Sequence, residues 1–176
     1  MELHIYGAYV PDHLTQFHSE KEGFIIKGTT EDALKTIGNS RVLLAPLLFG
    51  AGIKGKLTDA MLAGTPSVTT EIGAEGIRGD FPWNGFIIED AADFAEKAVM
   101  LYTNETLWKE KQLNGVAIIN SKFDGQKLET SFFRDIEKKM QSLDSDRRSN
   151  FMGSLLNYEK IKATKYMSKW IEEKNK

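Results

Sequence analysis

The chain has 176 residues, a hydrophobic share of 41%, a charged share of 27% and a formal net charge of -2. This length allows one sizeable core, and we expect one domain with a helical tail. The near-neutral charge argues against a broad nucleic-acid surface, and the lack of cysteine excludes disulfides and thiolate metal sites.

Short apolar runs alternate with helical patterns in the first half of the chain. This arrangement is typical of strand, helix, strand units on a mostly parallel sheet. The expected strands are residues 3–7, 23–28, 41–47, 66–70 and 85–89. The runs VLLAPLL and GFII are nearly continuous in apolar residues, as expected of strands covered on both faces. We predict an α/β fold, a Rossmann-like and mostly parallel sheet of about five strands with flanking helices and a C-terminal helical extension.

The helical patterns begin between these strands and dominate after the last one. One helix should start at Thr30 and end near Gly38, and a second should cover residues 56–63 and close at Gly64. Two later helices, around residues 90–108 and 127–143, should close the sheet. Their apolar faces are Phe94, Ala95, Ala98, Val99 and Tyr102 in the first and Leu128, Phe132, Ile136 and Met140 in the second.

The tail differs in charge from the rest of the chain. From Asp146 onwards it has eight Lys or Arg residues against four Asp or Glu, with apolar residues at helical spacing. We therefore expect a Rossmann-like domain at residues 1–143 and a basic amphipathic helical tail at residues 144–176. Contact with a membrane surface is a weaker alternative, because the acidic residues dilute the charge. The first residues lack a signal-peptide pattern, so we expect a cytoplasmic location.

Residues 50–57 have the sequence G-A-G-I-K-G-K-L, which is close to the nucleotide-hydrolase pattern G-x-x-x-x-G-K-[ST]. Leu57 occupies the position of the magnesium-binding hydroxyl, and Thr58 would point about 100° away on a helix. A hydrolase loop is therefore disfavoured. Glycines that lead into a helix still offer free amides to an anion, with Lys54 and Lys56 as added charge. The alternative is a tight turn with two solvated lysines.

The segment from LLAPLLFGAGIKGKL to PSVTTEIGAEGI, within residues 43–77, resembles bacterial group 1 glycosyltransferases of the GT-B fold. The shared elements are a strand that ends in Pro, the motif G-[SA]-G-I-[RK]-x-K, a helix written E-A-M-A-x-G, and P-V-V. The resemblance extends over most of the chain. It implies the C-terminal half of a hexosyltransferase of polysaccharide biosynthesis, which binds a nucleotide-diphosphate sugar. Transfer to a glycan or lipid-linked acceptor would need neither a metal nor a cofactor.

The resemblance also assigns roles to individual residues, while the catalytic residues stay unknown. The amides of Gly52, Ile53 and Lys54 would meet the diphosphate, whose negative charge grows as the sugar bond breaks. Lys54 and Lys56 would neutralise this charge. Asp59 would accept hydrogen bonds from the ribose hydroxyls, or would only be a first-turn helix residue favoured by the dipole.

Three further positions bear on the donor. Gly28 and Thr29, at the end of the second strand, would lie near the base. A glutamate that the family commonly places at the position of Ala51 is absent, which leaves the sugar undefined. Glu75 would lie near the cleft, or would only start a short turn.

Resembling enzymes also carry an N-terminal domain and a first strand that have no counterpart here. In the strand order 3-2-1-4-5-6, that strand would lie between residues 3–7 and 41–47. Either these two strands pair directly, or a second copy covers the exposed edges, or a separate chain supplies the rest. We expect no transferase activity from the isolated chain. The alternative function is a non-catalytic module that binds a nucleotide or assembles with a partner chain.

Overall fold

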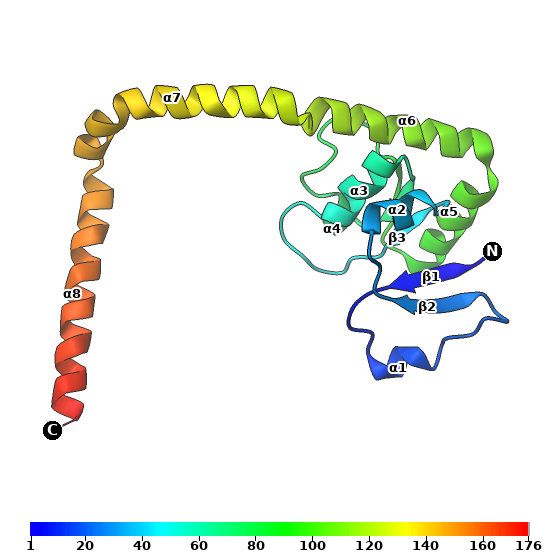
Figure 1. The fold of residues 1–176 in the computed structure, drawn as a ribbon, viewed down its shortest axis with the longest axis horizontal. Helices are drawn as coiled ribbons and strands as arrows, with labels where there is room; N and C mark the ends of the chain where they lie inside the picture. Colours follow the sequence, from blue (N-terminus) through cyan, green and yellow to red (C-terminus); the bar gives the residue numbers. More distant parts are fainter. Residues whose placement is uncertain (176) are drawn as a thin grey trace. The chain divides into compact units, whose positions relative to one another are not determined.

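The computed structural model describes residues 1–175, without the side chains of residues 159–161 (Figure 1). The chain divides into two compact units, which we treat separately. Unit 1 comprises Met1–Asp124, and unit 2 begins at Gly125. The boundary that we place between residues 143 and 144 from the sequence falls within a helix of unit 2 and stays a prediction.

Unit 1 contains five strands, and every pair that forms is parallel. The strands are β1 (Leu3–Tyr6), β2 (Phe24–Gly28), β3 (Leu43–Ala45), β4 (Ser67–Thr69) and β5 (Gly85–Ile87). Each lies within one of the five predicted apolar runs, so the predicted α/β class and the parallel strands are confirmed. The strands are one to four residues shorter than these runs.

The strands do not form the single sheet that the sequence predicts. They form one sheet of order β1-β2 and another of order β3-β4-β5, and Figure 1 shows β1 and β2 side by side. β1 and β3 therefore do not pair directly, which excludes one of the three expected outcomes for this isolated chain. Within the part of the chain that the structure describes, each of these two strands has a neighbour on one edge only.

Backbone alternation identifies the groups on the two open edges. The amide of Leu3 donates to Gly23 O at 2.7 Å, on the β2 side, and that of Leu43 donates to Pro66 O at 2.9 Å, on the β4 side. In a parallel ladder, the next residue directs its N–H and C=O to the opposite edge. The backbone groups of His4 and Leu44 therefore face the open edges.

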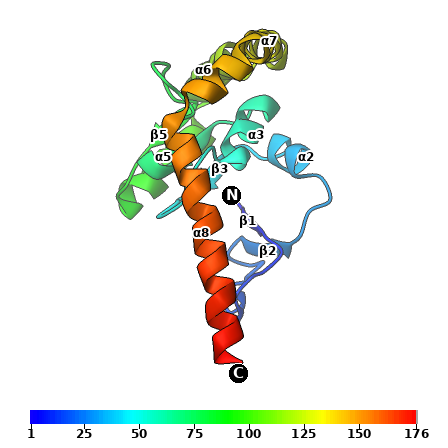
Figure 2. The same cartoon turned by 90° about the vertical axis from the view of Figure 1, so that its left-hand side faces the viewer.

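Six helices accompany the strands of unit 1. They are α1 (Asp12–Thr15), α2 (Ala33–Gly38), α3 (Gly55–Ala63), α4 (Glu71–Ala74), α5 (Ala91–Thr103) and α6 (Glu105–Lys122). The predicted start of α2 at Thr30 is early, because Asp32 is the N-cap and accepts from Lys35 N. Helix α3 ends as predicted at Gly64, which has the left-handed φ of 74°. Figure 2 shows α2 near α3, and the two helices are in contact.

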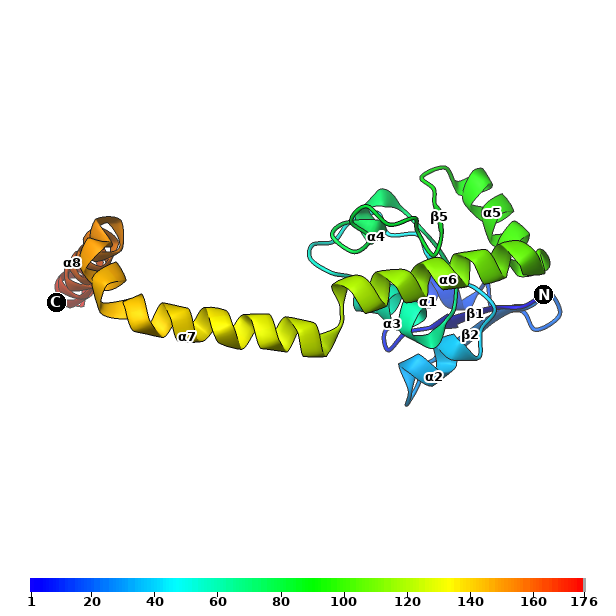
Figure 3. The same ribbon diagram turned by 90° about the horizontal axis from the view of Figure 1, so that it is seen from above.

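The core of unit 1 forms around α3. Leu57 and Met61 of this helix are almost fully buried, and so are Ile77, Trp83 and Ile118. Ile118 belongs to α6, which packs against α3 and passes over it in Figure 3. Helix α3, which follows the loop after β3, is therefore anchored in the core of unit 1.

Helix α6 is not predicted from the sequence, and the predicted apolar face of α5 is not its buried side. On α5, Val99 and Tyr102 are exposed, and Leu101 is the fully buried residue. A start signal for α6 was present, because Asn104 caps it by accepting from Leu107 N at 3.0 Å. A helical pattern was hard to see because Asn114 and Gly115, both poor helix formers, lie in the middle. Asn114 donates to Trp83 O, and Gly115 allows close packing against Asn84.

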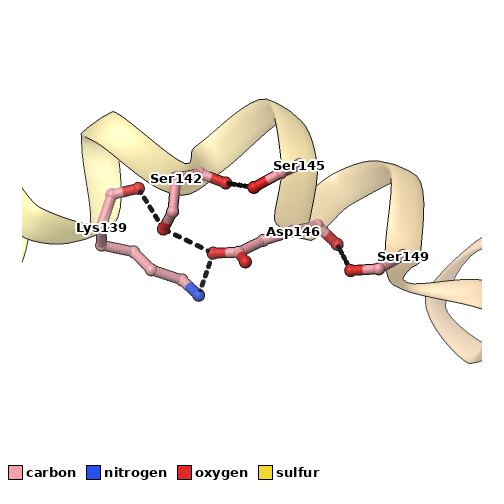
Figure 4. Close-up of polar contacts among 5 residues, drawn as sticks. All are labelled: Lys139, Ser142, Ser145, Asp146 and Ser149. Atoms are coloured by element: carbon pink, nitrogen blue, oxygen red, sulfur yellow. Dashed lines mark hydrogen bonds and ion pairs between the residues drawn. The ribbon is translucent and has the colours of Figure 1, made fainter.

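Unit 2 consists of two helices, α7 (Gly125–Ser149) and α8 (Phe151–Lys174). The predicted role of residues 127–143 in closing the sheet stays a prediction, because the sheet lies in the other unit. These residues belong to unit 2, and all four apolar side chains assigned to that face are exposed. Near the end of α7, Asp146 accepts from Lys139 and from Ser142, within the polar cluster drawn in Figure 4. These bonds lower the pKa of Asp146, the Lys139 bond contributing most.

Candidate functional site

The glycine-rich loop connects β3 to α3 and exposes backbone amides at the start of the helix. Gly52 has a φ of 72°, a left-handed conformation that L side chains rarely adopt. Lys54 is the N-cap, and the bond from Leu57 N to Lys54 O, 2.9 Å long, is the first of the helix. The amides of Gly55 and Lys56 precede this bond and have no partner within the helix. Such amides suit an anion.

The charged side chain of Lys54 is buried. Its side chain is only 8% exposed, and its Nζ lies 3.4 Å from Glu75 Oε2. An ammonium group has three N–H donors, and a buried charge requires partners. Among the side chains that the structure describes, Glu75 is the only acceptor for this ammonium. The site therefore holds a buried cation with unused donor capacity.

A pocket of about 400 Å³ lies beside this ion pair. It is lined by Gly50, Ala51, Gly52, Ile53, Glu75 and Gly76. The loop before α3 thus forms one side, and the chain after α4 forms the other. The two sides approach closely, because a Cβ added to Gly76 would lie 3.2 Å from Ile53 Cδ1.

The structure brings some of the predicted site residues together and leaves others apart. Gly52 and Ile53 line the pocket, and Lys54 contacts Glu75 at its edge. Lys56 is exposed and Asp59 is half-buried, and neither belongs to the pocket lining.

Gly28 and Thr29 lie apart from this lining, at the end of β2 in the other sheet. Their predicted contact with a base stays a prediction, like the roles of the other site residues. Glu75 has no role assigned from the sequence, which places it near the cleft or at the start of a short turn. The quoted GAEG run gave its position, but only the fold shows it opposite Lys54.

The hydrolase interpretation of the loop fails on geometry. Leu57 is fully buried, so a hydroxyl at this position would face the core rather than the loop. Thr58 Oγ1 donates to Gly55 O at 2.8 Å, which engages it within the helix. Among the residues that the structure describes, no group of three His, Asp or Glu side chains is arranged to hold a metal ion.

The described helices are all too short or too polar to cross a membrane.

Solved structures of similar proteins identify the fold of this chain. A crystal structure of TarM from S. aureus, a mutant in complex with fondaparinux, alpha-GlcNAc-glycerol and UDP, matches with a TM-score of 0.64. Another crystal structure of TarM matches with a TM-score of 0.63. Each match has 23% identity and covers 76% of this chain but 28% of TarM. The chain therefore has the fold of part of a GT-B glycosyltransferase.

The sequence comparisons identify the family. An uncharacterized 44.6 kDa protein in the cps region of Klebsiella pneumoniae is 30% identical over 113 residues, which is 63% of this chain and 29% of that protein. The chain thus spans less than a third of the length of these relatives. The family described as "Glycosyl transferases group 1" matches residues 1–104, more than half of the chain. The chain therefore belongs to the group 1 glycosyltransferase family.

Proposed function

We propose that this chain is the donor-binding half of a hexosyltransferase and binds the diphosphate of a nucleotide sugar at the start of α3. The observation that carries the proposal is the buried Lys54 beside free helix amides. A diphosphate carries several acceptor oxygens, so it can use both the amides and the spare donors of the ammonium. Lys56, exposed and two residues further along the chain, adds a second positive charge.

The same groups serve the chemistry of transfer. When the bond between the sugar and the diphosphate breaks, the leaving diphosphate gains negative charge. Donors that are already fixed in place stabilise this charge without reorganisation. In this proposal the helix amides and Lys54 supply that stabilisation, and no metal is needed.

The proposal assigns the rest of the nucleotide to the residues around this point. Asp59, on the next turn of α3, accepts hydrogen bonds from the ribose hydroxyls, and Gly28 and Thr29 lie near the base. The match to TarM, which was crystallised with UDP, makes uracil the first base to test. The cps location of the Klebsiella relative favours a role in polysaccharide biosynthesis.

We propose that transfer needs a further acceptor-binding part, which is a separate domain or a second copy of the chain. The open edges of β1 and β3 support this view, because unpaired strand edges favour pairing with another chain. The exposed apolar residues of unit 2 support it as well. The isolated chain should therefore bind a donor without transferring its sugar.

Calorimetric titration of the full chain with UDP, GDP and ADP tests the proposal. One nucleotide should bind, and Lys54→Met should weaken it about tenfold or more, since a hydrogen bond to a charged group contributes roughly 1.5–3 kcal/mol. Lys56→Met is the matched control and should have a smaller effect, because that side chain is solvated. If none of the three nucleotides binds, or if both variants bind as the wild type does, the proposal is wrong.

A further inference from the structure

Glu75 occupies a defined place opposite the loop, at the end of the short helix α4. Thr70 fixes the start of this helix, because its hydroxyl donates to Leu47 O at 2.6 Å and accepts from Gly73 N at 3.3 Å. The amide of Glu75 donates to Glu71 O at 3.0 Å. The backbone of Glu75 is thus anchored to the segment that follows β3.

One oxygen of the Glu75 carboxylate contacts Lys54, and most of the side chain is exposed to solvent. Oε2 lies 3.4 Å from the buried Lys54 ammonium, while the side chain as a whole is 70% exposed. It also lines the pocket together with Gly50 and Ala51. A carboxylate accepts through two oxygens, so one oxygen can stay on Lys54 while the other accepts from a ligand in the pocket.

The order of groups in a nucleotide sugar decides which part meets Glu75. Under the proposed function, on which this inference rests, the ribose lies by Asp59 and the diphosphate by the helix amides. The sugar is then the part that enters the space between Ala51 and Glu75. A carboxylate there accepts hydrogen bonds from sugar hydroxyls and repels a second carboxylate.

We propose that Glu75 is a specificity-determining residue that selects donors with an uncharged sugar over donors with an acidic sugar. Lys54 cannot offset the charge of an acidic sugar, because it is already shared between Glu75 and the diphosphate. An uncharged hexose gains an acceptor for its hydroxyls. Discrimination therefore arises from both an attraction and a repulsion.

The test compares matched donors on the full chain by calorimetry. UDP-glucose and UDP-glucuronic acid differ only in a carboxylate at one carbon of the sugar, and UDP serves as the reference. The wild type should bind UDP-glucose about tenfold or more tightly than UDP-glucuronic acid. Glu75→Gln should reduce this ratio several-fold without weakening UDP, because it removes the charge and keeps the shape. If GDP is the nucleotide bound, GDP-mannose and GDP-mannuronic acid replace this pair.

Glu71→Gln is the control, since it removes one exposed negative charge from the same helix. It should leave the ratio unchanged. A ratio near one in the wild type, or an unchanged ratio in Glu75→Gln, overturns the role of Glu75 while the diphosphate site stands. Loss of the ratio in both variants also overturns it, because the effect would then come from overall charge. Failure of all three nucleotides to bind overturns the inference and the proposed function together.

Discussion

Replacing Leu57 by serine restores the complete hydrolase signature, and the structure predicts that this change damages the protein instead of activating it. Leu57 is fully buried between Met61, Ala45 and Ala74 in the core of unit 1. Removing a buried leucine side chain costs about 2–5 kcal/mol through lost burial and the cavity left behind. The total stability of a domain is only about 5–15 kcal/mol, so Leu57→Ser should populate unfolded protein under mild conditions.

Leu62 provides a matched control, because it lies on the same helix and is 60% exposed. Urea unfolding of Leu62→Ser should give a free energy within about 0.5 kcal/mol of the wild type, as surface substitutions usually do. Leu57→Ser should also gain no magnesium-dependent ATPase activity, since the new hydroxyl faces the core. Equal stability of the two variants, or a gain of ATPase activity in Leu57→Ser, would refute the assignment of Leu57 to the core.

Two further predictions concern the Asp146 carboxylate of α7 and the open edge of β3. The lowered pKa of Asp146 means that its contribution to α7 is fully present above the ordinary aspartate pKa and is lost as the pH falls through the lowered value. An NMR titration of its carboxyl carbon should give a midpoint below that of an unfolded aspartate, and Lys139→Ala should raise it; an unshifted midpoint would contradict the contact. At the open edge of β3, the amide of Leu44 should exchange with deuterium faster than that of Leu43, which is bonded to Pro66 O. Equal slow exchange would mean that another chain already covers this edge.

The sequence predicted the parts of the fold that depend on local pattern. Each of the five strands lies within an apolar run, and α3 ends at Gly64 because a left-handed residue and a proline follow the last helical position. These features are set by residues close together in the chain. The split into two sheets depends on which strands lie side by side, and periodicity does not contain that information.

The helices show the same limit. The apolar stripe of residues 127–143 predicts a helix with one apolar face, and these residues do form part of α7, but the stripe does not say which surface that face contacts. Conversely, α6 was missed because Asn114 and Gly115 interrupt its helical pattern. Both residues have tertiary roles, one as a donor to Trp83 O and the other as a close contact of Asn84. A local irregularity that is satisfied by a distant partner cannot be told from a helix end in one sequence.

The sequence assigns roles to residues on one side of the candidate site only, for a physical reason. The loop of residues 50–56 is a contiguous motif, so the resemblance could assign its amides and lysines. Glu75 is 21 residues beyond Lys54, and a lone acidic residue after a short helix has many explanations. Only the fold shows that this carboxylate is the partner of a buried ammonium. Because that ammonium is also the proposed diphosphate ligand, the affinity for the phosphates and the choice of sugar are coupled through one side chain, Lys54.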